Sequence, residues 1–396
     1  MISVQRALKL IVANTTVLDS EFVDIGDSVG SILSDNILAP ISLPPFDQSA
    51  MDGYAIQFSD YIFKKKIEVI GEVAAGDLFH GKIISGQAIR IFTGAPIPDG
   101  ADTVVMQEKI AIEKGNLIIK DFALKRGNNI RKTGSQIKKD KIAFSKGMII
   151  TPGGVGYMAG LGISSVNVIS KPRITIVVTG SELRRPGEAL SKGKIYESNS
   201  CALSAALYSM GLKAGNIIFV NDDKIKTFNA LKKAVKNSDM VVLTGGVSVG
   251  EYDFVGKAIS QLRAENIFYK IKQKPGKPLF FAKYNKTLIF GMPGNPAATL
   301  SCFYEYVYPA IRIMCGHKDI YLKKVLLPIA EHYSKKKGLS FFLKAKILDN
   351  TVIPLEGQES YILSSFALAD SLIYLPEESE SIKKGEIVEV HKLPCL

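Results

Sequence analysis

The chain has 396 residues, 46% of them hydrophobic and 22% charged, which is ordinary for a folded protein and excludes general disorder. Fifty Lys and Arg against 38 Asp and Glu give a formal net charge of +12, but the lysines form short, scattered clusters. Such clusters favour a solvated surface over a nucleic-acid or lipid site. No apolar run approaches the ~18–20 residues of a membrane span and the N-terminus lacks a signal-peptide core, so we expect a cytoplasmic protein.

The hydrophobic patterning changes along the chain and predicts five segments. Residues 47–138 contain short alternating runs between Gly, Asp and Pro turns, which is typical of β-structure. The glycine-rich stretch at 152–163 favours a helix broken by glycines. In chain order we predict an N-terminal helical and linking segment (1–46), a mostly-β domain (47–138), a linking segment that returns to the first (139–170), an α/β domain (171–318) and a C-terminal domain (319–396).

Residues 171–318 alternate between β-rich runs and segments with helical periodicity. This alternation predicts βαβ units in a doubly wound, mostly parallel sheet with helices on both faces. Ser198–Ser200 offers N-cap candidates for one of these helices, and Gly211 is a signal for the end of the same helix. Residues 319–396 return to short alternating runs and predict a small β-barrel. The fold class is therefore α/β multidomain.

Three glycine loops follow predicted strands of the α/β domain, at 177–183, 243–253 and 290–296. Ligands of such sheets bind beyond the carboxyl ends of the strands. Glycines let backbone N–H groups approach an anion, and a helix behind the loop adds the positive end of its dipole. We therefore expect a phosphate-bearing ligand, with tight turns alone as the alternative. The candidate binding residues in these loops are Gly245, Gly246, Ser248, Gly250, Pro293, Gly294 and Asn295.

Three carboxylates stand just after predicted strands: Glu182, Asp222 and Asp253. Carboxylates beside an anion repel it unless a divalent cation lies between them. Mg²⁺ is typically held by one or two carboxylates together with ligand phosphates and waters. We therefore expect Mg²⁺, or another divalent cation, bound by these three residues. The alternative is helix capping by Asp253 and turn formation by Asp222.

Four lysines are concentrated in YKIKQKPGKPLFF, at 269–281. Strand alternation would place Lys270, Lys272 and Lys274 on one face, and Pro275-Gly276 would turn Lys277 back toward them. Such a group of ammonium ions suits an oxyanion, although a solvated edge strand would show the same pattern.

Six long motifs occur in order along the chain, and together they resemble the molybdopterin molybdenumtransferase family, which includes the C-terminal domain of gephyrin. The motifs are PPFDQSAMDGYAI (44–56), RIFTGAPIPDGADTVVMQE (90–108), RGNNIRKTG (126–134), TGGVSVGEYDF (244–254), KPGKP (274–278) and GMPGNP (291–296).

This resemblance implies insertion of molybdenum from molybdate into adenylylated molybdopterin, with release of AMP, in a divalent-metal-dependent reaction. It also implies a homodimer with each active site shared between subunits and contacts with other molybdenum cofactor biosynthesis proteins. Asp52 and Thr93 would come from the mostly-β domain of one subunit. The catalytic acids Glu182, Asp222 and Asp253 and the substrate-binding Lys270, Lys274 and Lys277 would come from the α/β domain of the other.

The chain departs from the family pattern at three places. Gln136 stands where members often carry an acid, Ala298 stands where many carry Ser, and the C-terminal domain has no Arg. Lys344 is a candidate to replace one missing arginine charge at the molybdate pocket.

Two alternatives to the transferase stay open, a non-catalytic gephyrin-like scaffold and the preceding adenylyltransferase. The retained Asp52 and Glu182 disfavour the scaffold. The two β-regions that flank the α/β domain disfavour the adenylyltransferase.

Overall fold

The chain divides into two units. The structure, a computed structural model, describes residues 1–246 and 254–394. The first unit comprises Met1–Glu21, Gly30–Ile32 and Ile169–Leu396, and the second comprises Phe22–Val29 and Leu33–Val168. Within the described ranges, none of the helices has the length and apolar character needed to cross a bilayer.

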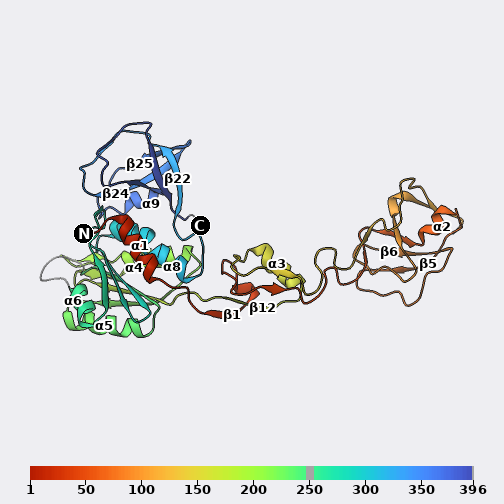
Figure 1. The fold of residues 1–396 in the computed structure, drawn as a ribbon, viewed down its shortest axis with the longest axis horizontal. Helices are drawn as coiled ribbons and strands as arrows, with labels where there is room; N and C mark the ends of the chain where they lie inside the picture. Colours follow the sequence, from red (N-terminus) through yellow and green to blue (C-terminus); the bar gives the residue numbers. More distant parts are fainter. Residues whose placement is uncertain (247–253, 395–396) are drawn as a thin grey trace. The chain divides into compact units, whose positions relative to one another are not determined.

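A six-stranded sheet forms the centre of the first unit (Figure 1). In spatial order its strands are β16 (Ala214–Val220), β13 (Ile174–Thr179), β17 (Met240–Thr244), β21 (Thr287–Met292), β20 (Phe280–Tyr284) and β18 (Glu265–Tyr269). The first four run parallel, whereas β20 and β18 are each antiparallel to their neighbours. A two-residue turn with Asn285 at φ 53° joins β20 to β21, and so short a connection requires antiparallel strands. The sheet is therefore mixed.

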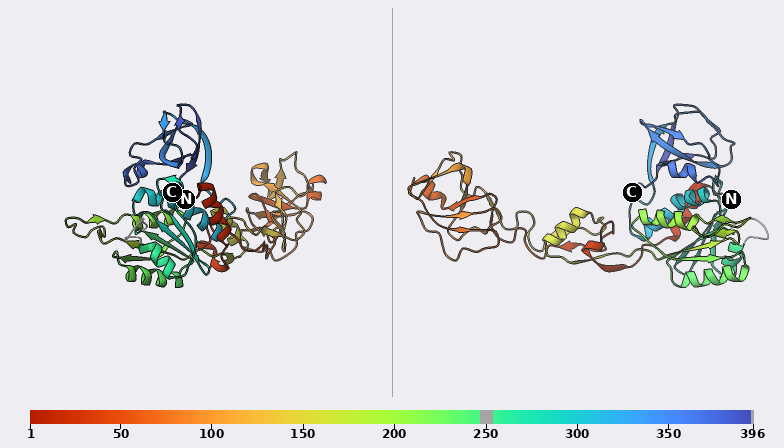
Figure 2. Two further views of the ribbon diagram at one scale, coloured as in Figure 1. Left: turned by 60° about the vertical axis from the view of Figure 1, so that its left-hand side comes forward. Right: turned by 180° about the vertical axis from the view of Figure 1, so that it is seen from behind.

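Helices cover both faces of this sheet (Figures 1 and 2). Ile176 and Val178 of β13 pack into one core with residues of α1 and α4, whereas Val177 packs into a second core with residues of α5 and α6. Adjacent strand residues face opposite sides of a sheet, so both faces of β13 are buried. The helices are α1 (Val4–Asn14), α4 (Asn199–Ser209), α5 (Lys224–Lys236), α6 (Phe254–Gln261), α7 (Pro296–Cys302) and α8 (Tyr308–Met314), with a π-helical segment at Phe303–Val307 between α7 and α8.

The predicted ends of the helix after Ser198 are confirmed, but its cap is a different side chain. Ser198 occupies the N-cap position of α4, and Gly211 follows the helix at φ 70°. The first-turn N–H of Ser200 donates to the Glu197 carboxylate at 2.7 Å, and the Ser200 hydroxyl donates to the same group at 2.5 Å. Glu197 therefore satisfies the orphan donor that a serine cap was expected to satisfy.

The C-terminal residues add a second sheet to the first unit. Its strands are β19 (Gln273–Lys274), β24 (Ser340–Leu348), β26 (Ser371–Leu375), β28 (Ile387–Lys392) and β22 (Lys323–Pro328), with β25 (Thr351–Pro354) paired to β24. Smaller elements are the pair β23 (Tyr333–Ser334) and β27 (Ser381–Ile382), and α9 (Ser364–Leu368). Alternate residues such as Leu343, Ala345 and Ile373 form its core. The β-character predicted for this region is present, and a closed barrel remains a prediction.

The second unit is built on a six-stranded sheet with a core on each face. Its spatial order is β7 (Thr103–Met106), β4 (Gly53–Ile56), β6 (Gln87–Ile91), β5 (Glu68–Val73), β9 (Asn116–Ile119) and β8 (Ile110–Glu113), with α2 (Phe58–Ile62) after β4. Short strand pairs in this unit are β3 (Gln48–Ser49) with β10 (Ile130–Arg131) and β2 (Ile37–Leu38) with β11 (Ile142–Phe144). The pair β1 (Ser20–Asp24) with β12 (Ser165–Ile169) contains residues of both units.

The glycine-rich stretch at 152–163 does form a helix, α3 (Pro152–Gly160). Thr151 caps it by accepting a hydrogen bond from the Gly154 N–H at 3.1 Å, and proline stands at its start, where a missing N–H has no cost. Met158 of this helix packs against Leu33 and Val166.

Candidate functional site

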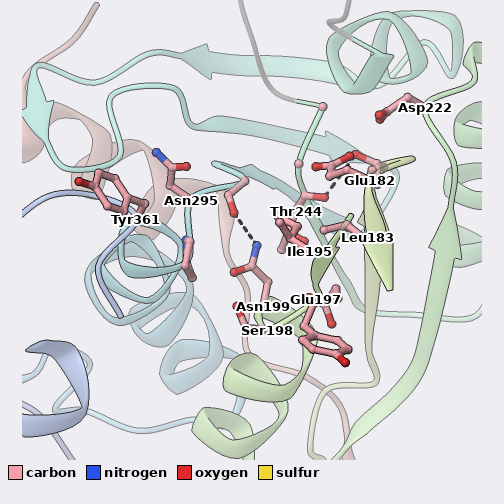
Figure 3. A pocket seen from close by; sticks show the side chains of 17 residues that line it. Glu182, Leu183, Ile195, Glu197, Ser198, Asn199, Asp222, Thr244, Asn295 and Tyr361 are labelled. Carbon is pink, nitrogen blue, oxygen red and sulfur yellow. Dashed lines mark hydrogen bonds between the residues drawn. The ribbon is translucent and has the colours of Figure 1, made fainter. Parts of the chain in front are cut away.

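A cavity of about 550 Å³ lies at the carboxyl ends of the four parallel strands (Figure 3). The loop after β13 contributes Gly180 and Glu182, the loop after β16 contributes Asp222, and β17 contributes Thr244 with the glycines that follow it. The loop after β21 contributes Gly294, Asn295 and Pro296. The cavity therefore lies at the position where ligands bind in sheets of this type.

The sequence-predicted site residues divide into four groups. Glu182, Asp222, Gly245, Gly246, Gly294 and Asn295 line the cavity together. Ser248, Gly250 and Asp253 lie outside the described residues. Asp52 and Thr93 belong to the second unit. Pro293 and the lysines Lys270, Lys274 and Lys277 are in the first unit but do not line the cavity.

The cavity wall is acidic. Glu182, Glu197 and Asp222 line it, and no lysine or arginine does so among the described residues. Glu197 is committed to the start of α4, as described above. Glu182 and Asp222 lie on one side of the cavity, with Asn295 and Tyr361 on the opposite side (Figure 3). An anionic ligand therefore meets two carboxylates on the side of Glu182 and Asp222.

Asp222 is held by the loop that carries Glu182. Its Oδ2 accepts a hydrogen bond from the Ser181 N–H at 3.0 Å, and its own N–H donates to the Ser181 hydroxyl at 3.0 Å. Its neighbour Asp223, rather than Asp222, caps α5 by accepting from the Lys226 N–H at 2.7 Å. Asp222 thus fixes two strand-end loops against each other, which differs from the local turn considered as the alternative.

The residues present fit a hard divalent cation. Glu182 and Asp222 offer carboxylate oxygens from two different strand ends, and one or two carboxylates completed by ligand phosphates are the usual protein contribution to Mg²⁺. The described residues contain no group of three His, Cys, Asp or Glu side chains arranged to hold a metal ion. The third acid that we predicted, Asp253, lies outside them.

Glycine is required at 245 for a steric reason. Gly245 has φ 80°, and a Cβ atom there would lie 2.3 Å from the Thr179 carbonyl oxygen. A Cβ on Gly246 would lie 2.8 Å from the Thr179 hydroxyl. The two glycines therefore allow the loops after β13 and β17 to pack closely, whichever ligand they meet.

Two of the expected anion-binding N–H groups are engaged within the protein. In the loop after β13, Gly180 donates to the Val220 carbonyl and Ser181 to Asp222. The element that follows is not a helix but β14 (Leu183–Arg184), which pairs with β15 (Ile195–Tyr196). The expectation of a helix dipole behind this loop is wrong, because the chain continues into this short strand pair before α4 begins.

The α7 N-terminus is also occupied. The N–H groups of Ala297 and Ala298 donate to the Ser360 carbonyl at 3.1 and 3.2 Å. The Asn295 side chain donates to the Ser360 hydroxyl at 2.7 Å. We had expected these two amides to bind an anion, but they bind the C-terminal region instead.

The lysines do not share one strand face as predicted. Lys270 has φ 67°, a left-handed conformation that breaks the strand alternation after β18. Lys272 forms an ion pair with Glu377 at 3.4 Å, and the Lys274 ammonium lies 5.4 Å from the Phe341 ring centre. The turn itself is present, because the Ile271 N–H donates to the Lys277 carbonyl at 3.0 Å.

Gly276 is essential to that turn. It has φ 82°, and a Cβ atom there would lie 2.4 Å from the Cys302 sulfur. The turn is therefore packed directly on the helix that follows the third glycine loop.

Asp52 and Thr93 form a bonded pair in the second unit. The Thr93 N–H and hydroxyl each donate to Asp52 Oδ1 at 2.8 Å. These hydrogen bonds, with a smaller effect of the nearby Arg90 charge, hold the pKa of Asp52 below its usual value. Asp52 is therefore kept ionised and oriented by the loop after β6.

Lys344 does not supply a charge to the cavity. Only 1% of the residue is exposed, and its ammonium donates to three backbone carbonyls of the C-terminal region. Its ammonium is committed to backbone contacts inside the C-terminal region, and its replacement of a missing arginine stays a prediction.

Sequence reasoning missed several residues that line the cavity, among them Glu197, Asn199 and Tyr361. The Asn199 side chain donates to the Gly294 carbonyl at 2.8 Å, shown dashed in Figure 3. It had been interpreted only as part of a helix start. Tyr361 comes from the C-terminal region, and no local pattern marks it as a site residue.

Comparison with known proteins matches most of the chain to three family models. Family models match the MoeA N-terminal region (domains I and II) at residues 2–162, a probable molybdopterin-binding domain at 175–313 and the MoeA C-terminal region (domain IV) at 327–393.

Among curated relatives, a molybdopterin molybdenumtransferase of Staphylococcus epidermidis (strain RP62A) is 34% identical over 98% of this chain and 95% of its own length. One from Staphylococcus aureus (strain COL) is 32% identical over the same shares. A crystal structure of the molybdopterin biosynthesis MoeA protein from Pyrococcus horikoshii matches with a TM-score of 0.86 and 29% identity, covering 100% of both chains.

Proposed function

Because the chain belongs to the molybdopterin molybdenumtransferase family and acts in molybdenum cofactor biosynthesis, we propose that it transfers molybdenum from molybdate to adenylylated molybdopterin. AMP is the leaving product. The reaction takes place in the cavity at the carboxyl ends of β13, β16, β17 and β21.

The acidic wall of this cavity is the observation that carries the proposal. Glu182 and Asp222 face a ligand that carries phosphate, and no basic side chain compensates them among the described lining residues. A divalent cation resolves this conflict, because it is attracted both to the carboxylates and to the phosphate oxygens. Mg²⁺ is the proposed ion, held by Glu182 and Asp222 and completed by Asp253. Bound there, it would supply positive charge to the phosphate oxygens of the substrate.

The protein side chains position the substrate. Asp222 and Ser181 fix the two acidic loops against each other, so that the Asp222 carboxylate keeps its orientation before the ligand arrives. Preorganised groups stabilise developing charge without reorganisation during the reaction. Lys270, Lys274 and Lys277 are proposed to attract the molybdate dianion, and Asp52 with Thr93 is proposed to act at the cavity of the other subunit in a homodimer.

Product analysis tests the function directly. The purified protein is incubated with adenylylated molybdopterin and Mg²⁺, with and without molybdate. AMP released only when molybdate is present supports molybdenum insertion. Pyrophosphate released from ATP and molybdopterin would instead identify an adenylyltransferase, and no turnover of either substrate would identify a scaffold.

A further inference from the structure

Lys344 anchors a loop of the C-terminal region from the inside. It lies on β24, and its ammonium donates to the carbonyl oxygens of Gly357, Glu359 and Ile362 at 2.5, 3.2 and 2.9 Å. A lysine ammonium has three donors, so each has an acceptor in this loop. Hydrogen bonds from a charged donor are about twice as strong as neutral ones. The segment that carries these three carbonyls, residues 357–362, is called the 357–362 loop.

The backbone of Lys344 holds the same loop a second time. The Gln358 side chain accepts a hydrogen bond from the Lys344 N–H at 2.9 Å and donates to the Lys344 carbonyl at 2.8 Å. One residue of β24 thus fixes the 357–362 loop through both its main chain and its side chain.

The other side of the 357–362 loop forms part of the cavity wall. Ser360 accepts from the first N–H groups of α7 through its carbonyl and from Asn295 through its hydroxyl, as described above. The next residue, Tyr361, lines the cavity while 65% of it remains exposed. In Figure 3 its ring stands on the side of the cavity opposite Asp222.

We propose that Lys344 is a positioning residue, which holds the 357–362 loop so that Tyr361 presents an aromatic face to the planar pyrimidine ring of a molybdopterin-type substrate. This inference rests on the proposed function for the identity of the ligand. A tyrosine ring offers a large contact area at low entropic cost, and planar heteroaromatic rings stack on it. Lys344 does not touch the ligand and acts only through the loop.

Amide hydrogen exchange tests the anchoring without any ligand. Lys344→Met keeps most of the side-chain volume but removes all three donors. Exchange should accelerate roughly tenfold or more in the 357–362 loop and at the amides of Ala297 and Ala298, because they depend on the position of Ser360.

Lys335→Met is the matched control. Lys335 is also buried, at 7% exposure, and donates to the Leu339 carbonyl at 2.9 Å in the same region, but not to the 357–362 loop. It should leave the exchange of Ala297 and Ala298 unchanged. Equal acceleration in both variants would overturn the proposal, because it would show general loosening.

Equilibrium binding of molybdopterin tests whether Lys344 acts through Tyr361. Tyr361→Ala should weaken binding roughly three- to tenfold, the usual value of one aromatic contact. Lys344→Met should weaken it by a similar factor, and the double variant should be no weaker than Tyr361→Ala alone. Losses that multiply in the double variant would overturn the proposal.

The two measurements separate this inference from the proposed function. If the unaltered protein does not bind molybdopterin, the proposed function fails, while the exchange result still decides whether Lys344 anchors the loop. If Lys344→Met does not fold, Gln358→Ala replaces it, since it breaks two bonds to the same residue at a half-buried position. Unchanged exchange of the loop in Gln358→Ala would then count against the proposal.

Discussion

At the scale of single residues, Asp222 combines two roles that a substitution can separate. One oxygen holds the Ser181 amide, and the carboxylate charge faces the cavity. An asparagine retains an acceptor oxygen for the amide but loses the charge. A metal role and a loop-fixing role therefore predict different outcomes for the same variant.

We expect Asp222→Asn to shift the Mg²⁺ dependence of AMP release to higher concentration, because carboxylate is the preferred hard ligand for this ion. Nucleotide affinity measured without metal should hold steady or improve, since one repulsive charge is gone. Titrations of both quantities test this. Asp223→Asn is the control, because it removes the same charge one position away and asparagine is also a good helix cap. Equal Mg²⁺ curves for Asp222→Asn and the unaltered protein would rule out a metal role for Asp222.

The lysines near the Pro275-Gly276 turn differ in what they already contact. Lys272 forms an ion pair with Glu377. Lys277 lies beside Ile271 across the turn, where its carbonyl accepts a hydrogen bond from the Ile271 N–H. We expect Lys277→Ala to raise the KM for molybdate by roughly tenfold to more than a hundredfold, the loss of one charge-assisted hydrogen bond.

The KM for the pterin nucleotide should change much less. Lys272→Ala serves as the control and should leave both KM values near those of the unaltered protein. If Lys277→Ala raises both KM values equally, Lys277 binds phosphate and the assignment to molybdate is wrong.

At the scale of elements, a buried histidine joins β28 to the π-helical segment. His391 Nδ1 lies 2.7 Å from the Glu305 carboxylate, and its Nε2 lies 2.8 Å from Glu389, which Lys324 also contacts at 2.8 Å. Although burial opposes the charged form, the two carboxylates outweigh it and raise the pKa of His391 to about 9. The same network lowers the pKa of Glu389 to about 2.

This network makes stability depend on pH. The folded state binds the His391 proton more tightly than the unfolded state, whose histidine pKa is near the ordinary value of 6.5. The stabilisation is therefore complete below about pH 6.5 and is lost as the pH rises through about 9. We expect the free energy of unfolding to fall by roughly 3 kcal/mol across this window.

Denaturant unfolding of the unaltered protein and of His391→Gln at several pH values measures this effect. The difference between the two should shrink as the pH rises, because glutamine does not titrate. His332→Gln, at an exposed histidine bonded to Ser334, is the control and should show no such trend. A difference for His391→Gln that stays constant from pH 6 to 9.5 would refute a charged His391.

The sequence predicted those elements that local patterns encode. Alternating and β-branched runs predicted strands of the three large sheets, and Ser198 and Gly211 marked real helix ends. The pattern failed where tertiary contacts override it. Lys270 leaves the strand in a left-handed conformation, and the two-residue turn at Asn285 reverses the sheet direction.

The candidate site shows the same division. The strand-end position of Glu182 and Asp222 follows from the βαβ pattern, so their meeting in one cavity could be predicted. Tyr361 and Lys344 could not, because their roles depend on hydrogen bonds between β24, the 357–362 loop and the start of α7. A single sequence contains no periodicity that reports such contacts.

At the scale of the whole molecule, the proposed chemistry divides between the two units. The acidic cavity belongs to the first unit and the Asp52–Thr93 pair to the second. If each active site of a homodimer takes its cavity from one subunit and its Asp52–Thr93 pair from the other, defects in the two units complement each other. Defects within one unit do not.

We therefore expect a mixture of Asp52→Ala and Glu182→Gln proteins to regain activity after subunit exchange. With equal amounts and random pairing, half of the dimers are hybrids, and each hybrid carries one site with neither substitution. Roughly a quarter of the sites should then be active, which follows from the two-fold symmetry of the dimer. A mixture of Asp52→Ala with Thr93→Ala is the matched control, because both changes lie in the second unit and no hybrid site escapes them. AMP release from each mixture, with dimers verified by sedimentation, measures the result. Recovery in both mixtures, or in neither when hybrids are demonstrably present, would show that the active site is not shared between subunits in this way.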